Sequence, residues 1–385
     1  MRKVLLLGAS GSIGSQTLDI LRADPKAFLL TAFSVGHQIE KIPSILSSFP
    51  FVNAICVQEE EDVTKLKISY PSIHFYSGDE GLKSLIEESD CDMVVNALVG
   101  FVGLVPSITA LSRDKILCLA NKESLVVGGS FIQRLLKQGH GKLYPIDSEH
   151  VALAKLLSRV NRDDVDKLVI TASGGSFRTL SRNQLNAVTP EMALKHPTWK
   201  MGGKITIDSA TMMNKGFEVI EAKWLYDFPL QRTEILMHDE SHVHSLLLMK
   251  DGSYYADISD PDMHTPIKYA LYETNVDFQV FHEKELSAFG PYHFHKFDPE
   301  RYPAVGLALD AYRDGGLKTT ILNAANEVAV YAFLKGQIPF LDIEREVSFA
   351  LATLPNNFSP SLRDVLAMDA LTRLAVSRHI ASKRK

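Results

Sequence analysis

Short runs of hydrophobic residues alternate with amphipathic stretches through the first third of the chain. The runs at 4–7, 29–35, 93–98 and 116–120 have the length of buried strands, and a helical spacing follows the first of them. Alternation of this kind is typical of βαβ units around a parallel sheet. We therefore expect an α/β fold that begins with a Rossmann-type dinucleotide-binding domain at residues 1–146.

The pattern changes after this first segment. Strand-like runs at 168–171, 204–207 and 243–249 predict a central α+β domain, which we place at 147–272 and expect to carry a catalytic site.

The last part of the chain has a helical pattern. Ile321, Ala325 and Val328 recur at helical spacing, so residues 302–385 should form a C-terminal helical domain. Residues 273–301, with a Gly-Pro pair and scattered aromatic residues, are expected to connect the two domains.

Composition narrows the class of protein. With 385 residues, 45% of them hydrophobic and 23% charged, the chain should fold as two or three globular domains. The 41 basic and 46 acidic residues give a net charge of -5, so we expect no nucleic-acid partner. The apolar runs are far shorter than the roughly 20 residues of a membrane span, so we expect no membrane partner either.

Three cysteines, Cys56, Cys91 and Cys118, lack a short metal-binding spacing and do not suggest a disulfide framework. The N-terminal apolar run ends after four residues at Gly8, unlike a signal peptide. We therefore expect a cytoplasmic protein.

A glycine-rich segment follows the first strand. Residues 8–14 read Gly-Ala-Ser-Gly-Ser-Ile-Gly, and a helix-like stretch comes directly after them. Between a strand and a helix, such a turn lets the backbone approach a pyrophosphate and directs helix N-terminal amides at it. The strand–turn–helix context favours nucleotide binding over a purely structural turn.

The end of the second strand indicates the type of dinucleotide. NAD sites usually have an acidic residue there, whereas this chain has Gly36-His37-Gln38. A histidine and an amide can hydrogen-bond to a 2′-phosphate, and no carboxylate in this stretch repels it. The sequence therefore favours NADP over NAD.

Carboxylates are concentrated in two segments of the central region. Asp147 and Glu149 project to one side of an extended chain, and Asn214, Glu218 and Glu221 form one stripe of a predicted helix. Carboxylates without cysteine suit a hard cation such as Mg²⁺ or Mn²⁺. The alternative is an ordinary solvated helix face.

Two further segments could bind ligands. Residues 173–176, Ser-Gly-Gly-Ser, could present hydroxyls and amides to an anion with charge from Lys215, although such turns are also common without a ligand. Residues 196–203 combine Trp199 with flexible glycines and could form a lid, or else a surface loop with a buried tryptophan.

These segments together resemble the 1-deoxy-D-xylulose 5-phosphate (DXP) reductoisomerase family. The resemblance spans nearly the whole chain and is carried by residues 8–14, 120–124, 147–150, 173–175, 196–202, 208–221 and 322–327. It implies an NADPH- and divalent-metal-dependent enzyme, commonly a homodimer, that converts the sugar phosphate DXP to 2-C-methyl-D-erythritol 4-phosphate in non-mevalonate isoprenoid biosynthesis.

The resemblance also assigns roles to individual residues. The metal ligands, which are also catalytic, would be Asp147, Glu149 and Glu218. Substrate would contact Ser148, Glu149, Ser173, His196, Trp199, Ser209, Asn214, Lys215 and Glu218. The cofactor would contact Gly8, Ser10, Gly11, Ser12, Ile13, Gly36, His37, Gln38, Asn121, Lys122, Glu123 and Gly202, and Lys122 would also act in catalysis.

His37-Gln38 departs from the basic residue and asparagine that the family often has, which affects how the 2′-phosphate would be held. Other functions are compatible with a nucleotide-binding domain: another NADP-dependent oxidoreductase acting on a phosphorylated carbonyl compound, or a non-catalytic NADP-binding sensor. An aldehyde dehydrogenase would need a nucleophilic cysteine outside the first domain, and the sequence has none after Cys118.

Overall fold

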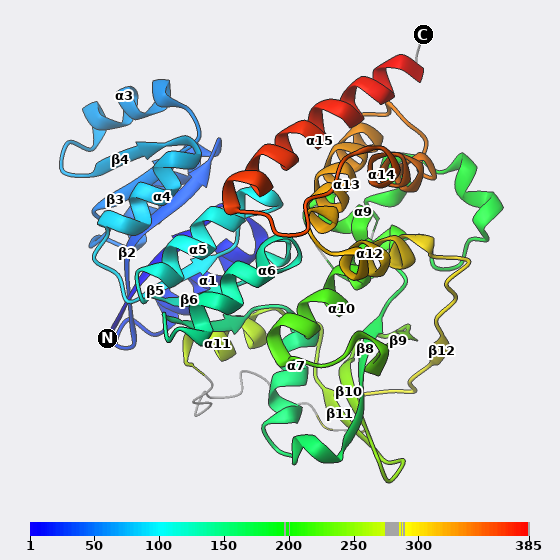
Figure 1. Ribbon diagram of the computed structural model, residues 1–385. Coiled ribbons are helices and arrows are strands. Elements are labelled where there is room, and N and C mark those ends of the chain that lie inside the picture. The colour runs from blue at the N-terminus through cyan, green and yellow to red at the C-terminus, as the bar shows by residue number, and fades with distance from the viewer. Residues whose placement is uncertain (196–197, 200, 274–284, 286, 288, 384–385) are drawn as a thin grey trace. The chain divides into compact units, whose positions relative to one another are not determined.

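The computed structural model describes residues 1–195, 198–199, 201–273, 285, 287 and 289–383. The chain divides into two compact units (Figure 1). The first comprises residues 1–124, 128–151 and the segment that begins at Asp262, and the second contains the other described residues. The three-domain division remains a prediction, and much of the predicted connector at 273–301 lies outside the described residues.

The first unit is built on a parallel seven-stranded sheet with the order β4-β3-β2-β1-β5-β6-β7. Its strands are β1 (Arg2–Leu7), β2 (Phe28–Gly36), β3 (Ala54–Val57), β4 (His74–Ser77), β5 (Met93–Asn96), β6 (Ile116–Leu119) and β7 (Lys142–Pro145). Its helices are α1 (Ser12–Ala23), α2 (Ile42–Ser48), α3 (Glu60–Ser69), α4 (Gly78–Glu88), α5 (Leu104–Ser112), α6 (Lys122–Lys137) and α11 (His264–Leu271).

The strand order reverses between β1 and β5, which are neighbours in the sheet. Right-handed crossovers on either side of this point send the connecting helices to opposite faces, and ligands of such sheets bind at the carboxyl ends of the strands there. The glycine-rich turn follows β1 directly, at Gly8. The Rossmann-type prediction is confirmed, and the turn lies at the expected end of the sheet.

The core of the first unit explains why these strands read as continuous apolar runs. Val4, Leu6, Phe33 and Ile55 are almost completely buried, because helices cover both faces of the sheet. α11 joins the same core through Ile267, although it lies far away in sequence.

The second unit has a mixed five-stranded sheet with the order β11-β10-β8-β9-β12. The strands are β8 (Val165–Ala172), β9 (Thr233–His238), β10 (Val243–Met249), β11 (Tyr254–Ile258) and β12 (Phe294–Lys296). The helices are α7 (Ser148–Leu157), which crosses the boundary of the units, α8 (Pro190–Ala193), α9 (Gly203–Thr211), α10 (Met213–Tyr226), α12 (Pro303–Asp314), α13 (Lys318–Leu334), α14 (Asp342–Thr353) and α15 (Leu362–Lys383).

One predicted strand is wrong. Residues 204–207, Lys-Ile-Thr-Ile, lie in α9, although polar and apolar residues alternate in them as in a strand. A run this short cannot separate the two periodicities, and in the folded chain an i,i+4 ion pair between Lys204 and Asp208 favours the helix. The predicted strands at 168–171 and 243–249 and the C-terminal helical pattern are confirmed.

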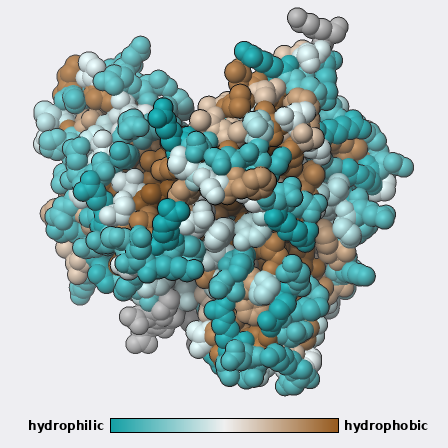
Figure 2. Space-filling model, viewed as in Figure 1, coloured by the Kyte–Doolittle hydropathy of each residue, from teal (hydrophilic) through white to brown (hydrophobic). Residues whose placement is uncertain are grey.

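Hydrophilic side chains cover most of the face shown in Figure 2, with apolar ones gathered in patches. Among the described residues, no helix is both long enough and apolar enough to cross a membrane.

Gly14 sets the geometry of the glycine-rich turn. A Cβ at this position would lie 2.1 Å from the Gly8 carbonyl oxygen and 2.7 Å from Ala9 backbone atoms. We expect Gly14→Ala to lower the thermal midpoint of the ligand-free protein, because backbone atoms would have to move. Gly306→Ala in α12 has open space and should leave the midpoint unchanged or raise it slightly. Equal midpoints for the two variants would contradict this role of Gly14.

Candidate active site

The glycine-rich turn is held by the second strand. The Gly8 amide donates to Ser34 Oγ at 2.9 Å, the Ala9 amide to the Ser34 carbonyl at 2.8 Å, and Ser10 Oγ to the Val35 carbonyl at 3.2 Å. Gly11 is the N-cap residue of α1 and provides no side-chain cap, and the first turn contains no acidic residue. The helix N-terminus is therefore suited to an anion.

The adjacent corner of the sheet differs from the prediction. Gly36 has a positive φ of 58° at the end of β2, and the exposed His37 follows it. The Glu59 carboxylate lies 3.4 Å from His37 Nδ1. The stretch itself has no carboxylate, as predicted, but one from another segment lies beside it. Glu59 comes from the β3–α3 connection and was not among the predicted site residues.

Asn121 organises the entry to α6. Its Oδ1 accepts from the Ser124 amide at 3.0 Å, and its Nδ2 donates to the carbonyls of Leu98 and Gly100 at 3.0 and 2.8 Å. These bonds tie the end of β6 to the loop after β5. They also place the neighbouring Lys122 and Glu123 at the start of α6, where both are buried.

Asp147 stands at the start of α7. Its Oδ1 accepts from the amides of Glu149 and His150 at 3.1 and 3.2 Å, which is an N-cap arrangement. Lys122 Nζ donates to its other oxygen, Oδ2, at 3.2 Å. Ser148 Oγ donates to Glu149 Oε2 at 2.6 Å. Four of the predicted residues thus share one end of this helix.

The other predicted carboxylate, Glu218, is 1% exposed on α10. Lys215 Nζ lies 2.7 Å from Glu218 Oε2, and Asn214 Nδ2 donates to Oε1 at 2.5 Å. Glu221 is also buried, so the alternative of a solvated polar stripe is wrong. Phe217, on the same helix, is fully buried as well.

Asp147, Glu149 and Glu218 can each offer one carboxylate oxygen, and these oxygens lie within 4.8 Å of one another. α7 connects them structurally: its start carries Asp147 and Glu149, and its later residue Leu153 shares a hydrophobic core with Val219 of α10. A set made only of oxygen ligands fits a hard divalent cation. The donors of this chain therefore suit Mg²⁺ or Mn²⁺.

The Ser-Gly-Gly-Ser segment packs on the end of α9. Gly174 and Gly175 both have positive φ, 81° and 69°. A Cβ on Gly175 would lie 2.7 Å from backbone atoms of Ser209 and Ala210. The close approach brings Ser173 and Ser209 into one neighbourhood, as an anion site requires.

α9 continues into α10 through a sharp bend. Met212 has a left-handed conformation, with φ of 63° and ψ of 11°, and ends one helix while it begins the next. Its carbonyl accepts from the Lys215 amide at 3.0 Å. The bend turns Asn214 and Lys215 onto the first turn of α10. Sequence reasoning missed it, since a non-glycine residue with positive φ has no strong sequence signal.

The segment proposed as a lid is described in part. His196 lies outside the described residues. Trp199 lies beside His244 of β10, with ring centroids 6.4 Å apart, and Gly202 caps the start of α9. His244 was not among the predicted residues.

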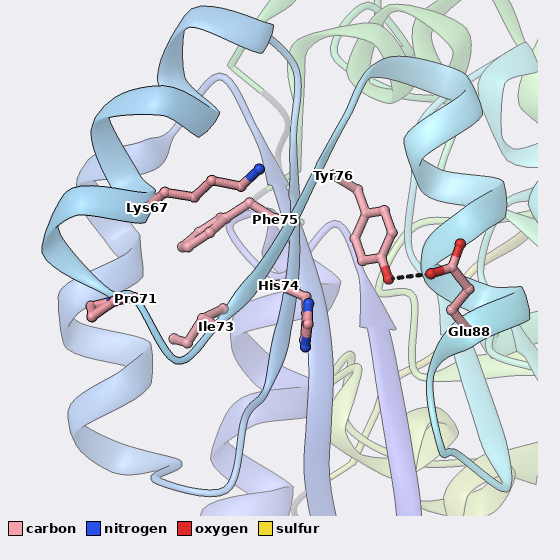
Figure 3. Close-up of a pocket in the computed structure, with 7 residues that line it drawn as sticks. All are labelled: Lys67, Pro71, Ile73, His74, Phe75, Tyr76 and Glu88. Atoms are coloured by element: carbon pink, nitrogen blue, oxygen red, sulfur yellow. Dashed lines mark hydrogen bonds between the residues drawn. The ribbon is translucent and has the colours of Figure 1, made fainter.

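A separate pocket lies beside β4, at the edge of the parallel sheet (Figure 3). It is lined by Lys67, Pro71, Ile73, His74, Phe75, Tyr76 and Glu88, none of which was predicted as a site residue. The Tyr76 hydroxyl donates a hydrogen bond to Glu88 Oε2 at 2.9 Å. Burial, with the Glu88 carboxylate nearby, raises the pKa of Tyr76 to about 12.

All three cysteines are buried thiols. Burial raises the pKa of Cys56 to about 12 and that of Cys91 to about 11, and it raises that of Cys118 as well. A thiol of this kind is a poor nucleophile at neutral pH. This argues further against cysteine-based aldehyde dehydrogenase chemistry.

The glycine-rich turn at the strand-order reversal places the chain among the dinucleotide-binding α/β enzymes, and the carboxylate cluster has the ligand set of a divalent-cation site. Comparisons with known families agree. A model of 1-deoxy-D-xylulose 5-phosphate reductoisomerase matches residues 4–129, one of its C-terminal domain matches 143–226, and one of the DXP reductoisomerase C-terminal domain matches 258–375. The chain belongs to the DXP reductoisomerase family.

Curated relatives and solved structures support the assignment over the full length. The chain is 42% identical to the 1-deoxy-D-xylulose 5-phosphate reductoisomerase of Listeria innocua, with 98% of this chain and 99% of the relative covered. It is 44% identical to that of Shouchella clausii, with coverages of 97% and 99%.

Two solved structures are similar throughout. A DOX-P reductoisomerase in complex with NADPH, fosmidomycin and magnesium has a TM-score of 0.93 at 34% identity, with both chains fully covered. The reductoisomerase of Zymomonas mobilis in complex with NADPH has a TM-score of 0.89 at 35% identity, with coverages of 98% and 99%.

The contact between the Gly175 loop and α9 can be tested. We expect Gly175→Ala to weaken binding of a sugar phosphate by about tenfold or more, because the loop that carries Ser173 must move off Ser209. Gly252→Ala is a matched control: its φ is also positive, at 88°, but it has open space around it. Isothermal titration with DXP would compare them. Equal affinities would show that the close approach is unimportant.

Proposed function

We propose that the chain catalyses the NADPH- and divalent-metal-dependent conversion of DXP to 2-C-methyl-D-erythritol 4-phosphate, a step of non-mevalonate isoprenoid biosynthesis. The observation that carries this proposal, beside membership of the family, is the cluster of Asp147, Glu149 and Glu218 oxygens. A redox sensor needs no such cluster. The cluster also agrees with a relative that holds magnesium with NADPH.

The nucleotide would lie on the first unit. Its pyrophosphate would face the amides of Ser10, Gly11, Ser12 and Ile13 at the start of α1, where Gly8 and Gly14 allow close approach. The 2′-phosphate would lie near Gly36, His37 and Gln38. NADPH supplies a hydride when bound.

His37 would have to exchange its contact with Glu59 for one with the 2′-phosphate. Asn121, Lys122, Glu123 and Gly202 complete the proposed cofactor contacts. The Asn121 side chain, which bonds to Leu98, Gly100 and Ser124, would also hold the loop after β5 in place.

Asp147, Glu149 and Glu218 would hold the cation. A divalent ion bound there stabilises negative charge on neighbouring substrate oxygens. Lys122 bonds to Oδ2 of Asp147 and Lys215 to Oε2 of Glu218, so each lysine offsets part of the negative charge of the cluster.

The substrate phosphate would be held by Ser173, Ser209, Asn214 and Lys215, which the Gly175 contact and the Met212 bend gather in the second unit. Ser148, Glu149 and Glu218 would contact the sugar oxygens, and Lys122 would act between cofactor and substrate. His196 would contact the substrate, as the resemblance implies, and Trp199 would help to exclude water from the site.

We also propose a homodimer in the cytoplasm. The family resemblance supports the dimer, and β11, an edge strand of the second sheet, exposes Tyr254, Tyr255 and Ile258. An exposed apolar edge strand is prone to pair with another chain. Three buried thiols suit a reducing compartment.

Sedimentation velocity tests the dimer. We expect the purified protein to sediment with twice the mass of one chain, and Tyr255→Lys to shift the distribution toward the monomer, because the charge would oppose edge pairing. A wild-type protein that remains monomeric at micromolar concentration would contradict this proposal.

Cofactor absorbance tests the reaction and its metal site. The protein should oxidise NADPH when given DXP with Mg²⁺ or Mn²⁺, and not with a chelator. Glu149→Gln should lower turnover by about a hundredfold or more, because the cation loses a charged ligand, and should leave NADPH binding intact.

Glu300→Gln removes an exposed carboxylate of the second unit and serves as the control. Near-normal turnover of the Glu149 variant would contradict the assignment of Glu149 as a metal ligand. Absence of NADPH oxidation by the wild type, with NADPH still bound, would favour another phosphorylated carbonyl substrate or a sensor.

A further inference from the structure

A buried polar contact joins α9 to α13 in the second unit. Asp208 on α9 is 2% exposed, and Asn326 on α13 is fully buried. Asn326 Nδ2 donates to Asp208 Oδ1 at 2.8 Å. The other carboxylate oxygen, Oδ2, lies 2.8 Å from Nζ of Lys204, whose side chain is 4% exposed.

The contact pairs the buried Asp208 carboxylate, which would be energetically costly without partners. A buried carboxylate needs a counter-charge and hydrogen-bond donors. Lys204 supplies the charge and also lies over the ring of Phe217, 5.4 Å from its centre. Asn326 supplies a donor from a different helix, so the position of α9 relative to α13 is fixed by a directional bond.

α13 is itself anchored on its other side. Glu327, next to Asn326, accepts from Arg373 of α15 at 2.6 Å and from Asn323 at 2.9 Å. Arg373 also bonds to Asp369 at 2.7 Å. The sequence motif at 322–327, to which the proposed reaction gives no role, therefore connects α9 to the C-terminal helix.

A small displacement of α9 would change the positions of proposed substrate-binding residues. This helix begins at Gly203, the last residue of the proposed lid, and Ser209 follows Asp208 directly. The next turn leads through the Met212 bend to Lys215. A shift of α9 would move Ser209 against the Gly175 loop and Lys215 with it.

We propose that Lys204, Asp208 and Asn326 form a positioning strut that holds Ser209 and the start of α10 in the geometry needed to bind the substrate phosphate. This inference rests on the proposed function. Asp208 and Asn326 act through α9 and do not contact the substrate.

Exchange of donor and acceptor tests the strut. Asn326→Asp places a second carboxylate against Asp208, whereas Asp208→Asn with Asn326→Asp restores one donor, one acceptor and the same net charge beside Lys204. We expect Asn326→Asp to raise the KM for DXP by about tenfold or more, with a smaller change in kcat and an unchanged KM for NADPH. The double variant should return the KM for DXP to near the wild-type value.

The kinetic pattern separates positioning from general stability. An unchanged KM for DXP in folded Asn326→Asp, or a loss confined to kcat, would overturn the strut, and so would a double variant that is no better than the single one. If Asn326→Asp does not fold, Asn326→Ser, which shortens the donor without adding charge, should show a smaller rise in the same KM. An unchanged KM in that variant overturns the strut as well. A wild type without DXP turnover would instead overturn the proposed function, and this inference with it.

Discussion

Repulsion between carboxylates is the constraint on which the rest of the site depends. Three acidic groups whose oxygens lie within 4.8 Å of one another favour protonation or separation unless positive charge is close. Two lysines supply positive charge: Lys122 bonds to Asp147, and Lys215 bonds to the almost fully buried Glu218. These lysines offset the repulsion at Asp147 and Glu218, so that the three carboxylates can stay close enough together to bind one divalent ion.

The backbone places these groups by a few local devices. Asp147 caps α7 with one oxygen and keeps the other for Lys122, so a single side chain both starts the helix and serves the site. A left-handed Met212 lets α9 and α10 meet at an angle, and a paired glycine turn lets the loop of Ser173 approach the α9 backbone. Substitution at Asp147, Met212 or the paired glycines would change the positions of the residues that bind the ligand. None of these three features needs to take part in a chemical step.

Sequence reasoning could predict the parts of the molecule that rest on local periodicity. The parallel sheet, the glycine turn and the carboxylates of α7 and α10 followed from runs of apolar residues, glycine spacing and charge, and the structure places Asp147, Glu149 and Glu218 together. Contacts between distant segments had no such signal. Glu59 beside His37 arises from strand pairing, and residues 204–207 alternate like a strand but lie in a helix.

The role of the polar residues in α9 and α13 could not be predicted from the sequence, because it depends on their burial in the folded protein. Buried ion pairs add little net stability, since desolvation offsets most of their attraction, but they strongly disfavour alternative packings that leave a charge unpaired. Asp208 between Lys204 and Asn326 is such a case. An apolar contact between α9 and α13 would tolerate sliding, whereas a carboxylate held by an ammonium and an amide accepts one register. A site assembled from several segments depends more on a single fixed register between its helices than on additional stability.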